Sequence, residues 1–119
     1  MRWVPDAAAQ ARITPILVAT PSQAVRKGPY VYPKGPYDHI VANSGRDETM
    51  MWTYERKGGG RGFGFTGGHT HAHWGDENQR KVVLNALLWI AKARVPKNGV
   101  ESTVTPDQLA ANFDPKGKK

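Results

Sequence analysis

The sequence predicts an α/β fold, and three features of the chain carry that prediction. An apolar run at 13–20 (ITPILVAT) is typical of a strand. Two β-prone segments, 50–55 (MMWTYE) and 61–66 (RGFGFT), flank a turn at 57–60 and predict a hairpin. A long apolar segment after Asp76 predicts a helix. At 119 residues, the chain has room for one domain at most.

The first predicted strand, 13–20, is expected to be buried, because its apolar residues follow one another without alternation before Pro21 and Ser22. Residues 21–49 then show no clean periodicity. They contain a short repeat, KGPY at 27–30 and again at 34–37, whose Gly-Pro pairs are typical of turns. A loop of this length inside a compact domain is often functional.

The helix after Asp76 is the firmest prediction. Asp76 is a good N-cap, and Gln79 stands three residues later as the partner of a capping box. Apolar residues occupy most of the circumference of this helix, so we expect a larger body to bury it. The other predicted elements offer little surface for that purpose, which predicts that part of the domain is missing.

A second, short helix is predicted at 106–112. Thr105 caps it, Pro106 suits its first turn, and Gln108 completes a capping box. Residues 114–119 are expected to be disordered.

Composition limits the classes of protein that the chain can represent. Only 39% of its residues are apolar, and 13 Gly and 9 Pro indicate long irregular stretches. The net charge of +7 raises the question of an acidic partner, but the basic residues are scattered and a solvated surface explains them better. Without cysteine the chain has no disulfide, thiolate metal site or cysteine nucleophile, and its redox compartment stays undetermined. No run reaches the roughly 20 apolar residues of a membrane span, and MRWVPDAAA lacks the apolar core of a signal peptide.

The glycines of the second hairpin strand match two nucleotide-binding patterns. Residues 62–67 (GFGFTG) fit the dinucleotide fingerprint, but Phe63 and Phe65 place these glycines inside a strand rather than in the turn before a helix. Residues 61–65 also match the start of an RNA-binding pattern, which then breaks at Thr66 and Gly68. We therefore expect both phenylalanines to face the core. A small basic RNA-binding module remains the alternative.

Three histidines alternate in GGHTHAHW, at His69, His71 and His73. In an extended chain they would share one face, as zinc ligands must, and Asp76 or Glu77 could complete a site. His-x-His tracts are nevertheless common without metal, and the preceding glycines predict a turn that disrupts the alternation. We therefore expect neither a metal nor another cofactor. General acid–base chemistry, or a polar loop that positions Trp74, remains open.

The long loop and the first hairpin strand carry aromatic and basic residues that suit a sugar. Flat rings contact the C–H groups of a pyranose, while Arg and His hydrogen-bond its hydroxyls. Packing of the loop on its own tyrosines is an equally good explanation. The residues concerned are Tyr30, Tyr32, Tyr37, His39, Arg46 and Trp52.

Residues 50–100 resemble the end of the bacterial ThuA-like, or trehalose-utilisation, family domain. That family ends with an apolar strand containing Trp, a Gly-rich turn and a strand leading into Gly-His. A polar helix start follows, then a run like LNALLWIA and an exit like VPKNGV. The upstream ITPILVAT and RKGPY…GPYDHIV are similar to the strand and insert that precede these features. The resemblance covers residues 1–104.

The resemblance implies a flavodoxin-like α/β/α fold, related to class I glutamine amidotransferases, of which this chain would be the C-terminal part without the first strands. Residues 105–119 would add a short helix and a basic tail. His69 resembles the late catalytic histidine of the amidotransferases, and His71 stands in place of their acid. With no cysteine in the chain, amidotransferase chemistry is not implied. What is implied is the binding or processing of a disaccharide or keto-sugar, with the question of enzymatic activity left open.

The expected site therefore combines two catalytic candidates with five substrate-binding candidates. The catalytic candidates are His69 and His71, and the substrate-binding candidates are Tyr37, His39, Arg46, Trp52 and Trp74. The expected partner is a small-molecule carbohydrate, not a nucleic acid or a membrane. A homo-oligomer or a missing N-terminal half would complete the sheet. A structural or interaction fragment without activity is a further alternative.

Overall fold

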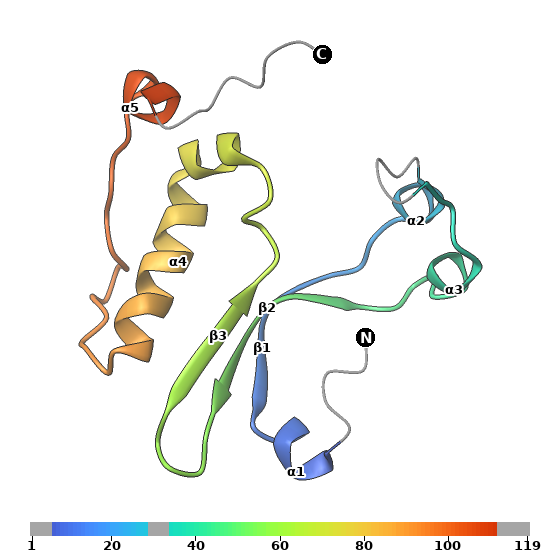
Figure 1. Ribbon diagram of the computed structural model, residues 1–119, viewed down its shortest axis with the longest axis horizontal. Coiled ribbons are helices and arrows are strands. Elements are labelled where there is room, and N and C mark those ends of the chain that lie inside the picture. Colours follow the sequence, from blue (N-terminus) through green and yellow to red (C-terminus); the bar gives the residue numbers. More distant parts are fainter. Residues whose placement is uncertain (1–5, 29–33, 112–119) are drawn as a thin grey trace. The chain divides into compact units, whose positions relative to one another are not determined.

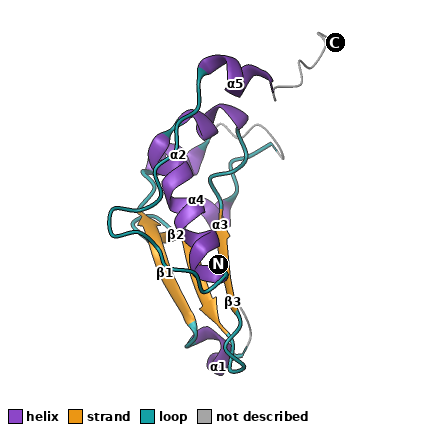
Figure 2. Cartoon of the chain, turned by 90° about the vertical axis from the view of Figure 1, so that its left-hand side faces the viewer, coloured by secondary structure: helices purple, strands orange, loops and turns teal. Residues whose placement is uncertain are grey.

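The computed structural model describes residues 6–28 and 34–111, and it confirms a mixed α/β chain (Figure 1). Three antiparallel strands hydrogen-bond in the order β1-β2-β3. The chain divides into two compact units, Met1–Thr53 and Tyr54–Lys119. Figure 2 shows the strands in the order β1, β2 and β3.

The first unit begins with α1 (Ala7–Gln10), which Asp6 caps by accepting a hydrogen bond from the Ala8 amide at 2.9 Å. Strand β1 (Ile13–Ala19) follows and includes Pro15. The strand is confirmed, but the prediction that it is buried is wrong: Ile16 is 48% exposed and Val18 is 51% exposed. The reason is that the later helices of the first unit pack on one another rather than on β1, so they leave its side chains exposed.

The prediction of a structureless segment at 21–49 is wrong in two places. Ser22 caps α2 (Gln23–Lys27) by accepting from the Val25 amide at 3.3 Å. The carbonyl of Tyr37 starts α3 (Asp38–Val41), and α3 packs against α2 (Figure 1). Short helices of this kind escape a search for periodicity, because one turn shows no repeat. Tyr30 and Tyr32 lie outside the described residues.

The hairpin is confirmed, with small shifts in its ends. Strand β2 (Glu48–Glu55) begins two residues earlier than expected, and β3 (Arg61–Phe65) ends one residue earlier. Hydrogen bonds within the turn join the Arg56 amide to the Gly60 carbonyl at 2.8 Å and the Gly59 amide to the Arg56 carbonyl at 2.9 Å. Gly59 has a φ of +78°, a conformation that glycine adopts without steric cost.

Helix α4 (Glu77–Ile90) begins where Asp76 predicted it, and Asp76 accepts from the Gln79 amide at 2.9 Å. Only half of the predicted capping box forms, because the Asp76 amide donates to the His73 carbonyl instead, at 3.0 Å. The helix packs against β3. Within the described chain, Ala86 is the one buried residue of α4, while Leu87 is 52% exposed, so its apolar circumference is only partly covered.

Helix α5 (Pro106–Ala111) begins with the complete capping box that its sequence predicted. The Gln108 amide donates to the Thr105 hydroxyl at 3.1 Å, and the Thr105 amide donates to the Gln108 side chain at 2.9 Å. The expected disorder at 114–119 concerns residues outside the described ranges.

Between α4 and α5 the chain runs back alongside α4 (Figure 1), and two polar side chains of the helix hold it there. Asn85 accepts from the Val100 amide at 2.8 Å. Arg80 donates to the hydroxyl and to the carbonyl of Ser102, both at 3.0 Å, and to the Trp74 carbonyl at 2.7 Å. One guanidinium thus joins three segments of the second unit. Among the described residues, no helix is long and apolar enough to cross a bilayer.

Candidate functional site

The seven predicted site residues fall into the two units of the chain. The second unit holds His69, His71 and Trp74. The first holds the other four: Tyr37, His39, Arg46 and Trp52. Each group must therefore be judged by its own surroundings.

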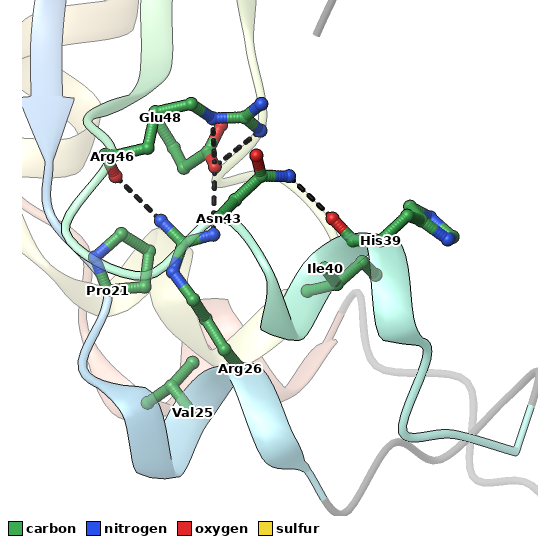
Figure 3. A pocket seen from close by; sticks show the side chains of 8 residues that line it. All are labelled: Pro21, Val25, Arg26, His39, Ile40, Asn43, Arg46 and Glu48. Carbon is green, nitrogen blue, oxygen red and sulfur yellow. Dashed lines mark hydrogen bonds and ion pairs between the residues drawn. The ribbon is translucent and has the colours of Figure 1, made fainter.

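The first unit contains a pocket of about 530 Å³, shown in Figure 3. A volume of this size is typical of small-molecule sites. Its wall comes from the chain around α2, from α3 with the turn that follows it, and from the start of β2. The lining residues are Pro21, Val25, Arg26, His39, Ile40, Asn43, Arg46 and Glu48. The fold of the first unit thus brings together residues that lie between positions 21 and 48 of the sequence.

A carboxylate between two guanidinium groups organises the polar side of this pocket. Arg26 is only 3% exposed and donates to Oε1 of Glu48 at 3.0 Å and to the Arg46 carbonyl at 2.6 Å. Arg46 donates to the same Oε1 through Nε at 3.0 Å and Nη2 at 2.7 Å. A buried guanidinium is tolerated only with such partners, because removal of its charge from water is otherwise costly. Glu48 therefore allows Arg26 to lie inside the unit.

The two arginines also change the acidity of Glu48. Hydrogen bonds from Arg46, and then from Arg26, hold the pKa of the Glu48 carboxyl below its usual value of 4.5, and partial desolvation opposes them. Glu48 is consequently ionised at neutral pH. The pocket thus contains a fixed negative charge between two fixed positive charges.

Three polar atoms at the pocket have no hydrogen-bond partner among the described residues. All three N–H donors reach Oε1 of Glu48, which leaves its Oε2 available as an acceptor. Asn43 donates through Nδ2 to the His39 carbonyl at 2.6 Å, which leaves its Oδ1 available. Nη1 of Arg46 is available as a donor on a side chain that is 45% exposed. The site can therefore both accept and donate hydrogen bonds to a ligand.

Apolar side chains provide another part of the pocket wall. In Figure 3, Val25 lies below the charged groups, and Pro21 and Ile40 lie on either side of Arg26. Val25 is 64% exposed on a helix of five residues, so a ligand can contact it without displacing other parts of the chain. An apolar wall with a few polar groups is typical of a small-molecule site.

Of the four candidates in the first unit, the pocket brings together His39 and Arg46. The His39 carbonyl orients Asn43, while its imidazole points away from the charged groups (Figure 3). The ring centroids of Tyr37 and His39 lie 5.8 Å apart. Tyr37 and the half-buried Trp52 of β2 are not among the lining residues. Among the described residues, the Tyr and Trp side chains expected to form an aromatic wall for a sugar therefore do not line this pocket.

In the second unit, the extended alternation considered for the histidines does not form. His71 to Gly75 adopt a 3₁₀ helix, η1 (His71–Gly75), closed by a hydrogen bond from the His73 amide to the Thr70 carbonyl at 3.1 Å. The ring of Phe65 lies against Gly67, so the chain turns sharply directly after β3. His69 lies exposed in this turn, ahead of the helix.

His71 faces the end of the chain rather than His69. Its Nε2 lies 2.9 Å from the Leu109 carbonyl of α5, and its ring lines a small cavity of about 310 Å³. The rest of the lining is apolar: Ala72, Pro106, Leu109 and Ala110. Trp74 is half-buried, and its carbonyl accepts from Arg80. Over residues 6–28 and 34–111, no three His, Cys, Asp or Glu side chains come close enough together to hold a metal ion.

Three polar residues of the pocket were not predicted from the sequence: Arg26, Asn43 and Glu48. Ser22 is a good cap three residues before Val25, and this signal could have located α2. No local sequence signal predicts the pairing of Arg26 with Glu48, because the two residues are 22 positions apart and meet only through the path of the chain between them.

Comparison with protein-family models, with curated proteins and with solved structures found no significant match for this chain.

Proposed function

We propose that this chain is a ThuA-like carbohydrate-utilisation protein that binds a disaccharide or a keto-sugar derivative in the pocket of its first unit. The observation that carries the proposal is the combination of polar atoms without partners and an apolar wall. Sugar hydroxyls can donate to Glu48 and Asn43 and accept from Arg46, while the C–H groups of the ring can contact Val25 and Ile40.

We also propose that the mixed α/β chain is part of the flavodoxin-like fold that the resemblance implies. We propose further that His69 and His71 are catalytic and that Trp74 binds substrate. The exposure of His69 supports a role in contacting substrate. The contact of His71 with the Leu109 carbonyl supports a structural role for that ring, which the family pattern alone does not suggest.

RNA binding through Phe63 and Phe65 has less support. Both residues are half-buried, α4 packs against their strand, and the ring of Phe65 lies against Gly67. A base-stacking platform needs open aromatic faces. The first-unit pocket therefore remains the better candidate for a ligand.

Calorimetric titration of the full chain with trehalose and with glucose tests the proposal. We expect weak, saturable binding, and we expect Asn43→Ala to weaken it about tenfold, the effect of losing one or two hydrogen bonds. Asn78→Ala removes the same group from an exposed position of α4 and should leave the affinity unchanged. If neither sugar binds, or if both variants bind equally well, the pocket is not the carbohydrate site.

A further inference from the structure

We infer that the ligand of the first-unit pocket carries a negative charge, as a sugar with a carboxylate or phosphate group does, and that Arg46 contacts this group. The inference rests on the proposed function, because it specifies the ligand of the same pocket. It follows from the balance of charges in the lining and from the different exposure of its two arginines.

The charges that line the pocket are not balanced. Two guanidinium groups, Arg26 and Arg46, face one carboxylate, Glu48. The nearest other acidic residues of the unit do not line the pocket: Asp47 pairs with the Thr20 hydroxyl, and Asp38 begins α3. One positive charge is therefore left without a counter-charge among the lining residues.

The two arginines differ in what they can offer to a ligand. The Arg26 side chain is 3% exposed, and it holds Glu48 and the Arg46 carbonyl in place from inside the unit. The Arg46 side chain is 45% exposed and uses only Nε and Nη2 for Glu48. The excess charge is thus accessible at Arg46, with Nη1 as the available donor.

Glu48 fixes the direction of that donor. Two hydrogen bonds from the Arg46 guanidinium to a single carboxylate oxygen hold its plane, because the guanidinium is rigid and its N–H bonds diverge in fixed directions. An anionic oxygen at Nη1 gains a charge-assisted hydrogen bond, which is roughly twice as strong as one between neutral groups. A neutral hydroxyl at the same position does not gain this advantage. The pocket should accordingly prefer an acidic sugar over its neutral analogue.

The test compares three ligands that share a glucopyranose ring by nuclear magnetic resonance titration of the full chain: glucose, glucuronate and glucose 6-phosphate. At low ionic strength we expect at least one of the two anions to bind about five- to tenfold more tightly than glucose. The preference should decline as salt is added, because the Arg46 side chain is partly exposed and its charge is screened. The two anions distinguish a carboxylate from a phosphate.

Arg46→Gln should abolish the preference for the anions. Arg94→Gln, an exposed residue of the second unit, removes the same charge and should retain the preference, which separates a local contact from the net charge of the chain. Arg46→Lys controls for folding, because it keeps the charge near the pocket and should retain part of the preference even though the rigid fork is lost.

The possible outcomes separate this inference from the proposed function. If all three sugars bind with the same affinity, or if Arg94→Gln removes the preference as Arg46→Gln does, the inference is wrong while carbohydrate binding stands. If none of the three binds at millimolar concentration, both are wrong. Chemical shift changes confined to residues around α2, α3 and the start of β2, lost in Arg46→Gln, would support both.

Discussion

The two units use their polar side chains in different ways. In the second unit, Arg80 and Asn85 direct their hydrogen bonds to the backbone and to Ser102, and they hold the chain along α4. In the first unit, Glu48 and Arg46 pair with each other at a pocket, and each keeps a polar side-chain atom without a partner among the described residues. Side chains that satisfy the backbone stabilise a fold, whereas side chains with available atoms can contact a ligand. The difference identifies the first unit as the place to search for a ligand.

The largest effect is expected at Glu48. Glu48→Gln removes the negative charge that compensates the buried Arg26, and it should lower the free energy of unfolding by about 3 kcal/mol, as happens when one partner of a buried pair is lost. Urea denaturation would measure the change. Asp38→Asn makes the same change of charge outside the pocket and should alter stability by less than about 0.5 kcal/mol. Equal effects of the two variants would mean that the pocket charges are not structurally coupled.

Arg80 provides the corresponding test in the second unit. Arg80→Met keeps the aliphatic stem but removes three hydrogen bonds, and it should cost about 2 kcal/mol of stability. Binding in the first-unit pocket should be unchanged. Arg94→Met, at an exposed position, is the matched control and should have little effect. A loss of ligand affinity in a still-folded Arg80→Met protein would show that the polar side chains of the second unit also contribute to ligand binding.

Two adjacent glycines offer a sharper test of the turn after β3. Gly67→Ala should destabilise the chain by about 1 to 2 kcal/mol, because a Cβ at this position would overlap the ring of Phe65. The nearest atom to a Cβ at Gly68 is a ring carbon of Trp74 at 3.8 Å, an ordinary contact, so Gly68→Ala should cost much less. Thermal denaturation of both variants would compare them. Similar melting temperatures would show that the Phe65 ring moves aside freely.

The effect of pH is confined to the acidic range, in which Glu48 takes up a proton. The pKa of Glu48 is lower in the folded chain than in the unfolded chain, so its contribution to stability is complete above about pH 4.5 and is lost as the pH falls through the lowered pKa. Unfolding of the wild-type chain and of Glu48→Gln should be compared from pH 7 to pH 3. The difference in stability between them should shrink in the acidic part of that range. A difference that stays constant with pH would exclude Glu48 as the group responsible.

The elements that could be predicted are those whose signals lie close together in sequence. Asp76 and Thr105 mark the starts of α4 and α5 because a cap and its helix are local neighbours. The exposure of β1 was not predictable, because an apolar run specifies a strand but not what covers it. Arg46 was recognised as a candidate, whereas Arg26 and Glu48 were not, because only the folded first unit brings their side chains together.

In the histidine tract, the glycines at 67 and 68 correctly predicted a turn that disrupts the alternation. The 3₁₀ helix that follows, and the contact of His71 with the Leu109 carbonyl, had no local signal in the sequence. A pattern predicts geometry only when the backbone keeps the period on which the pattern depends. Catalysis by His69 and His71 stays a prediction for the variants of these residues to test.

Strand β1 has a further consequence through Pro15. An apolar strand at the edge of a sheet is a template on which other chains can add, strand by strand, until fibrils form. Proline has no amide hydrogen, so Pro15 cannot donate to a neighbouring strand, and any added ladder would be weaker at that position. Pro15→Val would restore that donor, and it should shorten the lag time of aggregation.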